Sequence, residues 1–239
     1  MAHVFATMGT VVSVRVDDDA VDAATLDAVE AVFDDLDREF SRWRPDSPAS
    51  QIADGQLSLL RSSEAHRERY AEALRWRADT AGAFTPHRPD GTVDLAGTIK
   101  AAATEAAGNV LDAAGHERWC INAGGDVLTR GGTPAHPWTV ALADPDDPQH
   151  VLRVVSLHGP QRAVATSGTS QRGEHVWRTD PKSTYRQVTI VADDLMTADV
   201  LATAILAGGP ATRLLAEQGW PVHIVTVNRA GEPASSSGP

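Results

Sequence analysis

The chain has 239 residues, of which 42% are hydrophobic and 22% are charged, an ordinary balance for a globular protein with a substantial core. Its formal net charge of −11 and its pI near 5.2 argue against nucleic acid or an anionic membrane as the main partner. The single cysteine, Cys120, excludes an internal disulfide framework and a cysteine-based zinc site.

The first half of the chain is predicted to contain one strand and three helices. Alternating apolar and polar residues predict a strand over Val11–Val16, and apolar residues three and four apart predict an amphipathic helix over Ala23–Phe40. The expected buried stripe of this helix is Leu26, Val29, Phe33, Leu36 and Phe40. After an irregular link, helices are expected near Ser63–Thr80 and from about Thr98 to Ala114, where Gly115 provides a left-handed end.

The second half is rich in predicted strands. Short apolar runs predict strands at Trp119–Ala123, Trp138–Ala143, Val151–Leu157, Ala163–Thr166 and Gln187–Ala192. Two short helices, near Thr197–Leu206 and Pro210–Glu217, precede a last strand at Val222–Val227. Residues 230–239 are dominated by Gly, Pro and Ser and are expected to be disordered, which leaves a single domain over residues 1–229. Because strands follow strands, the pattern favours an α+β fold.

The sequence predicts no membrane insertion. No stretch approaches the ~20 apolar residues that a membrane-spanning helix needs. The first residues contain no basic segment followed by an apolar one, and no lipid-anchoring cysteine. We therefore expect a cytoplasmic location.

Asp199 and Thr203 are candidate metal ligands. Their spacing in an Ala- and Leu-rich helical segment places a carboxylate and a hydroxyl on one face, one turn apart. Both are hard oxygen ligands of the kind that Mg²⁺ prefers, and the pair leaves room for water or a phosphate oxygen. The alternative interpretation is structural: Thr197 caps the helix, and Asp199 complements the positive end of its dipole.

The segment Asn122-Ala-Gly-Gly-Asp126 interrupts two apolar runs with a glycine pair and a carboxylate. A hairpin turn explains the glycines, because it needs positive φ angles. A glycine pair also lets a backbone approach a ligand closely. The segment is neither a dinucleotide-binding fingerprint nor a Walker A sequence.

Further polar and aromatic residues lie beside predicted helix ends. Asp94 and Lys100 flank the start of the third helix, where backbone N–H groups and a lysine can bind phosphate. Alternatively, Asp94 or Thr98 caps that helix and Lys100 is solvated. Trp43, beyond the first helix, is a candidate to face a ligand ring. The hydroxyls around Ser167 lack the elbow that a serine hydrolase needs.

Taken in order, these segments resemble one family, the ApbE-type FAD:protein FMN transferases. The matching segments are Met8-Gly-Thr10, Phe40-Ser-Arg-Trp43 with Ser47, Gly82-Ala-Phe84, Asp94-Leu-Ala-Gly-Thr-Ile-Lys100, Asn122-Ala-Gly-Gly-Asp126, Thr166-Ser-Gly168, His175 and Ala198-Asp-Val-Leu-Ala-Thr203. The sequence departs from the usual family pattern at Thr85 and Glu105, where Asp is common, at Ala101-Ala102, where Gly-Tyr is common, and around Asp180, where it is two residues longer.

The resemblance implies an α+β, T-fold-related architecture of two related units of antiparallel sheet packed with helices. It implies Mg²⁺-dependent transfer of FMN from FAD to a threonine or serine hydroxyl of an acceptor flavoprotein, with release of AMP; Mn²⁺ is the alternative metal. The implied metal ligands are Asp199, Thr203 and the carbonyl of Gly97. The implied FAD contacts are Met8, Trp43, Ala83, Phe84, Thr85, Asp94, Lys100 and His175.

Two other functions fit the same residues. In an FAD pyrophosphatase, water would replace the protein hydroxyl and the products would be FMN and AMP. A non-catalytic flavin-binding module is favoured by the departures at Thr85 and Ala101-Ala102. If the chain is a transferase, His175 is the candidate catalytic residue, as a group that orients the phosphate or shuttles a proton.

Overall fold

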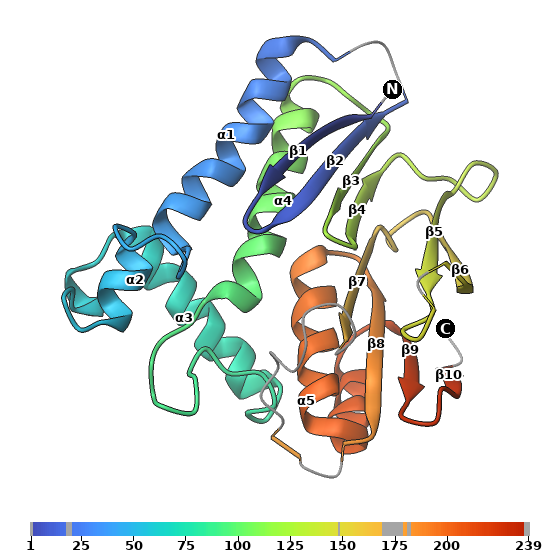
Figure 1. The fold of residues 1–239 in the computed structure, drawn as a ribbon. Coiled ribbons are helices and arrows are strands. Elements are labelled where there is room, and N and C mark those ends of the chain that lie inside the picture. Colours follow the sequence, from blue (N-terminus) through green and yellow to red (C-terminus); the bar gives the residue numbers. More distant parts are fainter. Residues whose placement is uncertain (1, 18–20, 148, 169–178, 181–182, 237–239) are drawn as a thin grey trace.

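An eight-stranded antiparallel sheet runs through the molecule (Figure 1). The computed structural model describes residues 2–17, 21–147, 149–168, 179–180 and 183–236. The strands of the sheet are β1 (His3–Thr7), β2 (Thr10–Val16), β3 (Trp119–Ala123), β4 (Asp126–Arg130), β7 (Ala163–Gly168), β8 (Tyr185–Ala192), β9 (His223–Asn228) and β10 (Pro233–Ser235). Their order in the sheet is β1-β2-β3-β4-β7-β8-β9-β10. A separate hairpin consists of β5 (Trp138–Ala143) and β6 (Val151–Leu157).

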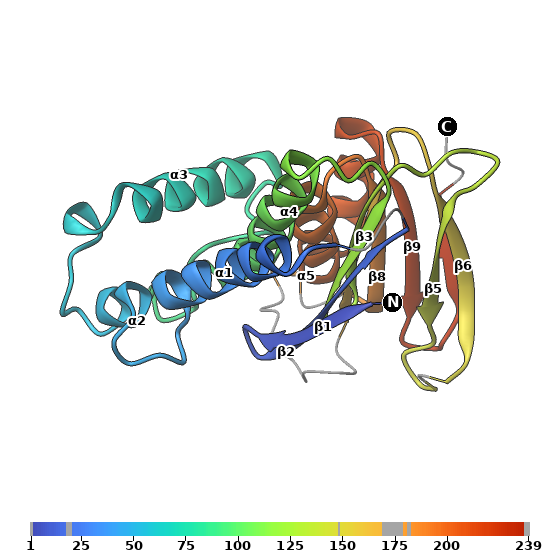
Figure 2. The same ribbon diagram turned by 90° about the horizontal axis from the view of Figure 1, so that it is seen from above.

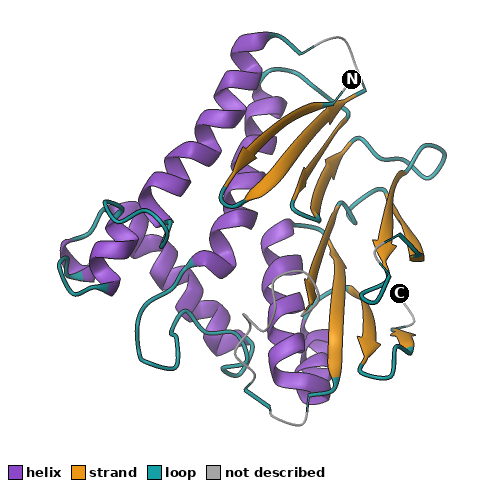
Figure 3. Cartoon of the chain, viewed as in Figure 1, coloured by secondary structure: helices purple, strands orange, loops and turns teal. Residues whose placement is uncertain are grey.

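The helices cover one face of this sheet and the β5–β6 hairpin covers part of the other (Figures 2 and 3). The helices are α1 (Ala23–Phe40), α2 (Pro48–Ala53), α3 (Glu64–Asp79), α4 (Ala96–Ala113) and α5 (Leu195–Gly219), with a 3₁₀ turn, η1 (Leu59–Arg61). Strand residues alternate between the two layers, as the pleat requires. Leu128 and Ile190 pack in the core on the helix side, whereas Val127 and Val191 pack against the hairpin.

The two halves of the sheet have the same element order. In the first half, β1 and β2 lead through α1 and α4 to β3 and β4. In the second half, β7 and β8 lead through α5 to β9 and β10. The halves meet where β4 pairs with β7, and the β5–β6 hairpin is inserted between them in the sequence. The predicted α+β class with antiparallel sheet is confirmed.

Elements with a clear hydrophobic period have the predicted bounds, and their paired neighbours were missed. The helix Ala23–Phe40 and the strand Trp119–Ala123 begin and end as predicted. Strands β1 and β4 were not predicted, although each forms a hairpin with a predicted strand. The link after Pro45 was expected to be irregular, yet it contains α2, whose N-terminal N–H of Ser50 is capped by the Ser47 hydroxyl at 3.0 Å.

The two predicted short helices, near Thr197–Leu206 and Pro210–Glu217, correspond to the two parts of α5 on either side of a kink. The chain kinks at Gly209, which has a φ of 69°, and Pro210 follows it. The carbonyl of Ala207 beside the kink accepts hydrogen bonds from the N–H groups of Thr179 and Asp180, at 3.2 and 3.1 Å. Within the described part of the chain, α5 is the one helix long and apolar enough to cross a membrane, contrary to the expectation from the sequence, but 78% of its most apolar stretch is buried.

The expected disordered tail contains structure. Strand β10 pairs with β9, and Ser236 exchanges hydrogen bonds with the backbone of Ile224. The prediction of disorder from Ala230 onward is therefore wrong for these residues, because pairing with β9 compensates for their weak local preference.

The single cysteine lies on β3, half-buried against the β5–β6 layer. Burial is the largest influence on it and raises the pKa of the Cys120 thiol to about 11.

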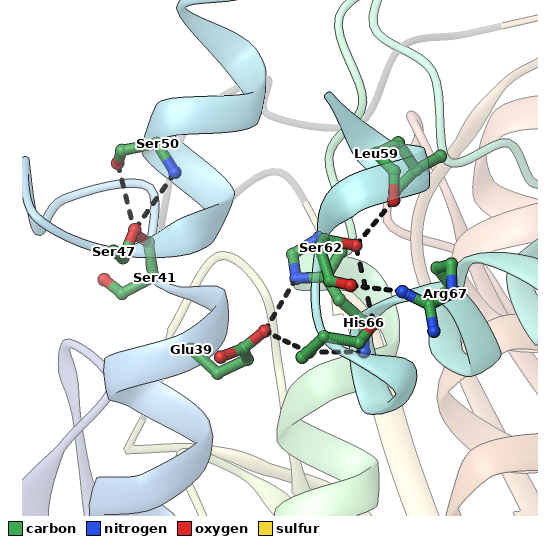
Figure 4. A network of polar contacts seen from close by, with 9 residues as sticks. Glu39, Ser41, Ser47, Ser50, Leu59, Ser62, His66 and Arg67 are labelled. Atoms are coloured by element: carbon green, nitrogen blue, oxygen red, sulfur yellow. Dashed lines mark hydrogen bonds and ion pairs between the residues drawn. The ribbon is translucent and has the colours of Figure 1, made fainter. Parts of the chain in front are cut away.

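A polar network joins the end of α1 to α2 and to the start of α3 (Figure 4). His66 is 1% exposed, and its Nδ1 lies 3.2 Å from the Glu39 carboxylate. The ring of His66 stacks on Phe40 with centroids 4.8 Å apart. The Ser47 hydroxyl donates to the carbonyl of Ser41 at 2.5 Å. These contacts fix both ends of the loop that carries Trp43.

Stability should depend on pH through His66. Burial lowers the pKa of His66 more than Glu39 raises it. The unfolded chain therefore binds this proton first, and the free energy of unfolding should fall as pH drops below about 6.5. In His66→Asn, denaturant titrations at pH 7 and pH 5.5 should show a smaller difference than in the wild type. The same change at exposed His136 is the control, and equal pH dependence in both variants would contradict the assignment.

The contact between α4 and β3 should be sensitive to one added methyl group. A side-chain carbon at Gly108 would lie 2.5 Å from the ring of Trp119, which is 1% exposed. We expect Gly108→Ala to lower the free energy of unfolding by about 1–3 kcal/mol. Gly219→Ala is the matched control, because nothing lies within 4 Å of a carbon added there. Equal unfolding midpoints for the two variants would contradict this packing.

Candidate functional site

Two of the predicted site residues, Lys100 and Thr203, lie where α4, β4, β7 and α5 meet. Lys100 in the first turns of α4 forms an ion pair with Asp126, the first residue of β4. Asp126 Oδ1 accepts a hydrogen bond from the N–H of Thr166 on β7, at 3.1 Å. The next residue, Ser167, has its hydroxyl 2.9 Å from that of Thr203 on α5. A continuous series of contacts thus links Lys100 to Thr203.

The Asn122–Asp126 segment is the tip of the β3–β4 hairpin. Gly124 and Gly125 have φ angles of 64° and 100° and join the paired residues Ala123 and Asp126. Asn122 Oδ1 accepts a hydrogen bond from the N–H of Gly125 at 2.9 Å. The hairpin interpretation is therefore confirmed.

A second hairpin tip lies beside the first. Met8 and Gly9, with φ angles of 49° and 67°, connect β1 to β2, and Met8 is partly buried against the helix-side core. Thr10 follows this tip, and a side-chain carbon at Gly124 would collide with its hydroxyl. Positive φ and close approach together require glycine at position 124.

Asp126 carries a buried charge. Its side chain is 2% exposed, and the buried Oδ2 makes no hydrogen bond of ordinary geometry with the described residues. The ammonium of Lys100, whose side chain is 21% exposed, lies against that oxygen and compensates its charge. The alternative in which Lys100 is merely solvated is therefore wrong.

Asp94 precedes the N-cap residue of α4, Leu95, and is not itself the cap. Its Oδ1 accepts a hydrogen bond from the N–H of Ala96 at 3.0 Å, and its Oδ2 lies 3.9 Å from Arg88 Nη1. Thr98 is not the cap, because its hydroxyl donates to the carbonyl of Leu95 at 3.0 Å. The hydrogen bond from Ala96 nevertheless holds the Asp94 carboxylate at the positive end of the helix dipole.

The turn after α3, which contains Ala83 and Phe84, packs against both α4 and α5. The Thr80 hydroxyl accepts a hydrogen bond from the N–H of Phe84 at 3.1 Å. A side-chain carbon at Gly97 would lie 3.2 Å from the Phe84 ring, and one at Gly208 would lie 2.8 Å from Ala83. The next residue, Thr85, is half-buried and accepts a hydrogen bond from the N–H of His87 at 3.2 Å. The two small glycines therefore let the Ala83–Thr85 segment approach both helices.

The start of α5 is capped by residues other than the one predicted. Asp194 accepts hydrogen bonds from both the N–H and the hydroxyl of Thr197, at 2.7 and 2.8 Å. Glu105 on α4 accepts from the N–H groups of Leu195 and Met196, at 2.9 and 3.1 Å, and burial raises the pKa of its carboxyl. The prediction that Thr197 caps this helix is wrong, since Thr197 is a donor to the cap.

Asp199 and Thr203 place two side-chain oxygen donors one turn apart on α5. Asp199 is 8% exposed, and Thr203, one turn further along α5, is half-buried. Their carboxylate and hydroxyl, with the Ser167 hydroxyl beside Thr203, are hard oxygen donors that suit Mg²⁺. No cluster of three or more His, Cys, Asp or Glu side chains exists among the described residues, so any divalent site there also needs hydroxyl, carbonyl or substrate oxygens.

One predicted site residue stands apart from this group. Trp43 is 94% exposed on the loop between α1 and α2. His175 lies outside the described residues.

A cavity of about 180 Å³ lies elsewhere, between α4 and the start of α5, and none of the predicted site residues lines it. Its lining residues are Glu105, Asn109, Asp112, Trp119, Leu128, Arg162 and Asp194.

Comparison with known sequences identifies relatives over most of the chain. A profile of the ApbE family matches residues 8–89 and 86–224. The chain is 27% identical to the FAD:protein FMN transferase of Klebsiella pneumoniae (strain 342) over 60% of its length, and 32% identical to that of Rhodobacter capsulatus over 54%. These matches cover 45% and 25% of the two relatives, so the chain spans less than half the length of the curated relatives it matches.

Solved structures share the fold nearly end to end. The ApbE protein of Thermotoga maritima superposes with a TM-score of 0.82 at 20% identity, covering 99% of this chain and 97% of its own. The flavin transferase ApbE of Vibrio cholerae gives 0.77 at 22% identity, covering 99% and 97%. The flavinyl transferase ApbE of Pseudomonas stutzeri, in its apo form, also gives 0.77 at 22%, covering 100% and 94%.

Proposed function

The chain belongs to the ApbE family, and on that basis we propose that it is an FAD:protein FMN transferase. The reaction is the Mg²⁺-dependent transfer of FMN from FAD to a threonine or serine hydroxyl of an acceptor protein, with release of AMP. Curated relatives named FAD:protein FMN transferase support the activity. The contact series from Lys100 through Asp126 and Ser167 to Thr203 carries the proposal, because it brings a cation and oxygen donors to one place.

The chemistry is phosphoryl transfer. The acceptor hydroxyl attacks the phosphorus on the FMN side of the diphosphate, a new phosphoester bond forms, the bridging P–O bond breaks, and AMP leaves with that oxygen. The hydroxyl proton passes to a base, and His175 is the proposed group that either accepts it or orients the phosphate. The diphosphate carries two negative charges, so the attack needs charge neutralisation and alignment.

The residues of this chain divide that work. Asp199, Thr203 and the Gly97 carbonyl are proposed to hold Mg²⁺, which when bound polarises phosphoryl oxygens and stabilises the departing charge; Mn²⁺ is the alternative metal. Lys100 supplies a second positive charge at the start of α4, where Asp94 orders the first turn.

The flavin end of FAD needs apolar contacts. Met8 at the β1–β2 tip, the Ala83-Phe84-Thr85 segment and Trp43 are the proposed contacts. The exposed indole ring of Trp43 provides a flat surface on which an aromatic ligand can stack. Protein flavinylation in the cytoplasm, on an acceptor flavoprotein, completes the proposal.

A mixing experiment tests this function. The chain is incubated with FAD, Mg²⁺ and an acceptor domain that presents a threonine in an exposed segment. We expect a covalent mass increase equal to FMN on the acceptor, with one AMP released per modified chain. Free FMN with AMP would instead indicate an FAD pyrophosphatase, and FAD binding without AMP release would indicate a non-catalytic flavin-binding module.

The metal assignment predicts that loss of the Asp199 carboxylate or of the Thr203 hydroxyl slows AMP release. Asp199→Ala should lower the rate of AMP release by about 100-fold or more, because a group that stabilises developing charge is lost. Thr203→Val should behave similarly, whereas Thr203→Ser keeps the hydroxyl and should retain most of the rate. The surface change Asp27→Ala is the control, and unfolding midpoints establish that each variant is folded. Full Mg²⁺-dependent turnover in Asp199→Ala would overturn the assignment.

A further inference from the structure

The two halves of the sheet join along β4 and β7, and this boundary is called the seam below. Backbone pairing across the seam stops before Asp126. The β4–β7 ladder contains the pairs Val127↔Val164 and Leu128↔Ala163 and does not continue to Asp126. Beyond it, the N–H of Thr166 is bound by the Asp126 carboxylate instead of a backbone carbonyl, at 3.1 Å. A side chain therefore takes over the pairing of the two strands at the point where they separate.

The same carboxylate holds Lys100. A buried charge without a compensating partner is costly, and Asp126 is 2% exposed with its Oδ2 against the Lys100 ammonium. A lysine stem is flexible, so an unanchored ammonium would sample many positions. The ion pair fixes that ammonium at the seam while 21% of the lysine side chain stays exposed.

The far side of the seam carries the proposed metal ligands. Thr166, held by Asp126, is followed by Ser167, whose hydroxyl contacts Thr203 at 2.9 Å. The position of Thr203 relative to Lys100 therefore depends on the hydrogen bond between the Asp126 carboxylate and the Thr166 N–H on β7.

We propose that Asp126 is a positioning residue that sets the Lys100 ammonium of the first half at a fixed place relative to the Asp199–Thr203 face of the second half, so that both grip one diphosphate. This inference rests on the proposed function for the identity of the ligand. Pre-ordering of the lysine lowers the entropic cost of binding, so the effect should appear in FAD affinity as well as in rate.

Substitutions separate the two contacts of Asp126. Asp126→Asn keeps an oxygen for the Thr166 N–H but removes the negative charge that anchors Lys100. Lys100→Met leaves Asp126 buried and uncompensated, and the double variant removes both charges. We expect Lys100→Met to lower the melting temperature most, on the order of 10 °C, and the double variant to recover part of that loss. If the melting-temperature shifts of the two single variants simply added in the double variant, the two side chains would not form a buried ion pair, and the inference would fail.

FAD affinity distinguishes the two possible roles of Asp126, because it would not change if Asp126 only stabilised the fold. In titrations of the full chain with FAD and no acceptor, Asp126→Asn should weaken binding about 10-fold, as lost pre-ordering of one charged contact predicts. Lys100→Met should weaken binding at least as much, and the double variant no more than Lys100→Met, since both changes act through one ammonium. If the loss of FAD affinity in the double variant equalled the product of the losses in the two single variants, the inference would fail.

Asp112 provides a matched control. Its carboxylate also accepts one N–H, from Trp119 Nε1 at 2.8 Å, and also pairs with a cation, Arg130. Asp112→Asn should leave FAD affinity within about twofold of the wild type, the scatter expected for a change that touches no ligand. Unchanged FAD affinity in folded Asp126→Asn would overturn the inference alone, whereas a wild-type chain that fails to bind FAD would overturn the proposed function as well.

If Asp126→Asn does not fold, Lys100→Arg keeps the test decisive. Arginine keeps the positive charge and the ion pair but places its planar fork differently from a lysine ammonium. We expect its melting temperature to stay near that of the wild type while FAD affinity falls several-fold. Wild-type FAD affinity in Lys100→Arg would show that the exact position of the cation does not matter, and the inference would fail.

Discussion

The charge of Asp126 is buried where two four-stranded halves of one sheet separate, and a buried carboxylate must be compensated and hydrogen-bonded to be stable. Its two partners come from different elements: Lys100 from α4 and the Thr166 N–H from β7. One residue thus ties the helix layer to both halves of the sheet. Lys100 and Thr203, two residues proposed to act on FAD or its metal, are linked through this point.

The duplicated arrangement explains why the candidate site lies on the helix side. In each half, hairpins carry helices on the same face, so α4 and α5 pack against each other over the β4–β7 seam. The opposite face is closed there by the β5–β6 hairpin, where Arg118 and Arg15 lie over the ring of Trp138. The hairpin tips and the end of β7 therefore present their polar groups toward α4 and α5.

Local patterns predicted α1, α3, α4 and the two parts of α5, the strands with clear periodicity and the glycine hairpin, because their causes lie within a few residues; α2 was not predicted. Contacts between distant segments were not predictable in this way. Glu105 caps α5 from a position 90 residues away, and Ser167 meets Thr203 only because β7 lies under α5. Strands β1 and β4 likewise owe their structure to pairing. Asp199, Thr203, Lys100 and Trp43 were candidates from spacing and residue chemistry, and Met8 and Gly97 came from the family resemblance. The ion pair of Lys100 with Asp126 could be seen only in the three-dimensional structure.

The half-buried thiol on β3 has a practical consequence. Burial raises the pKa of Cys120 to about 11, so very little thiolate, the reactive form, is present at neutral pH. Maleimide or iodoacetamide dyes should therefore react slowly with the native chain. A cysteine introduced on an exposed loop would then be the dominant labelling position, and fluorescence from that single dye could follow ligand binding without removing Cys120 from its packed layer.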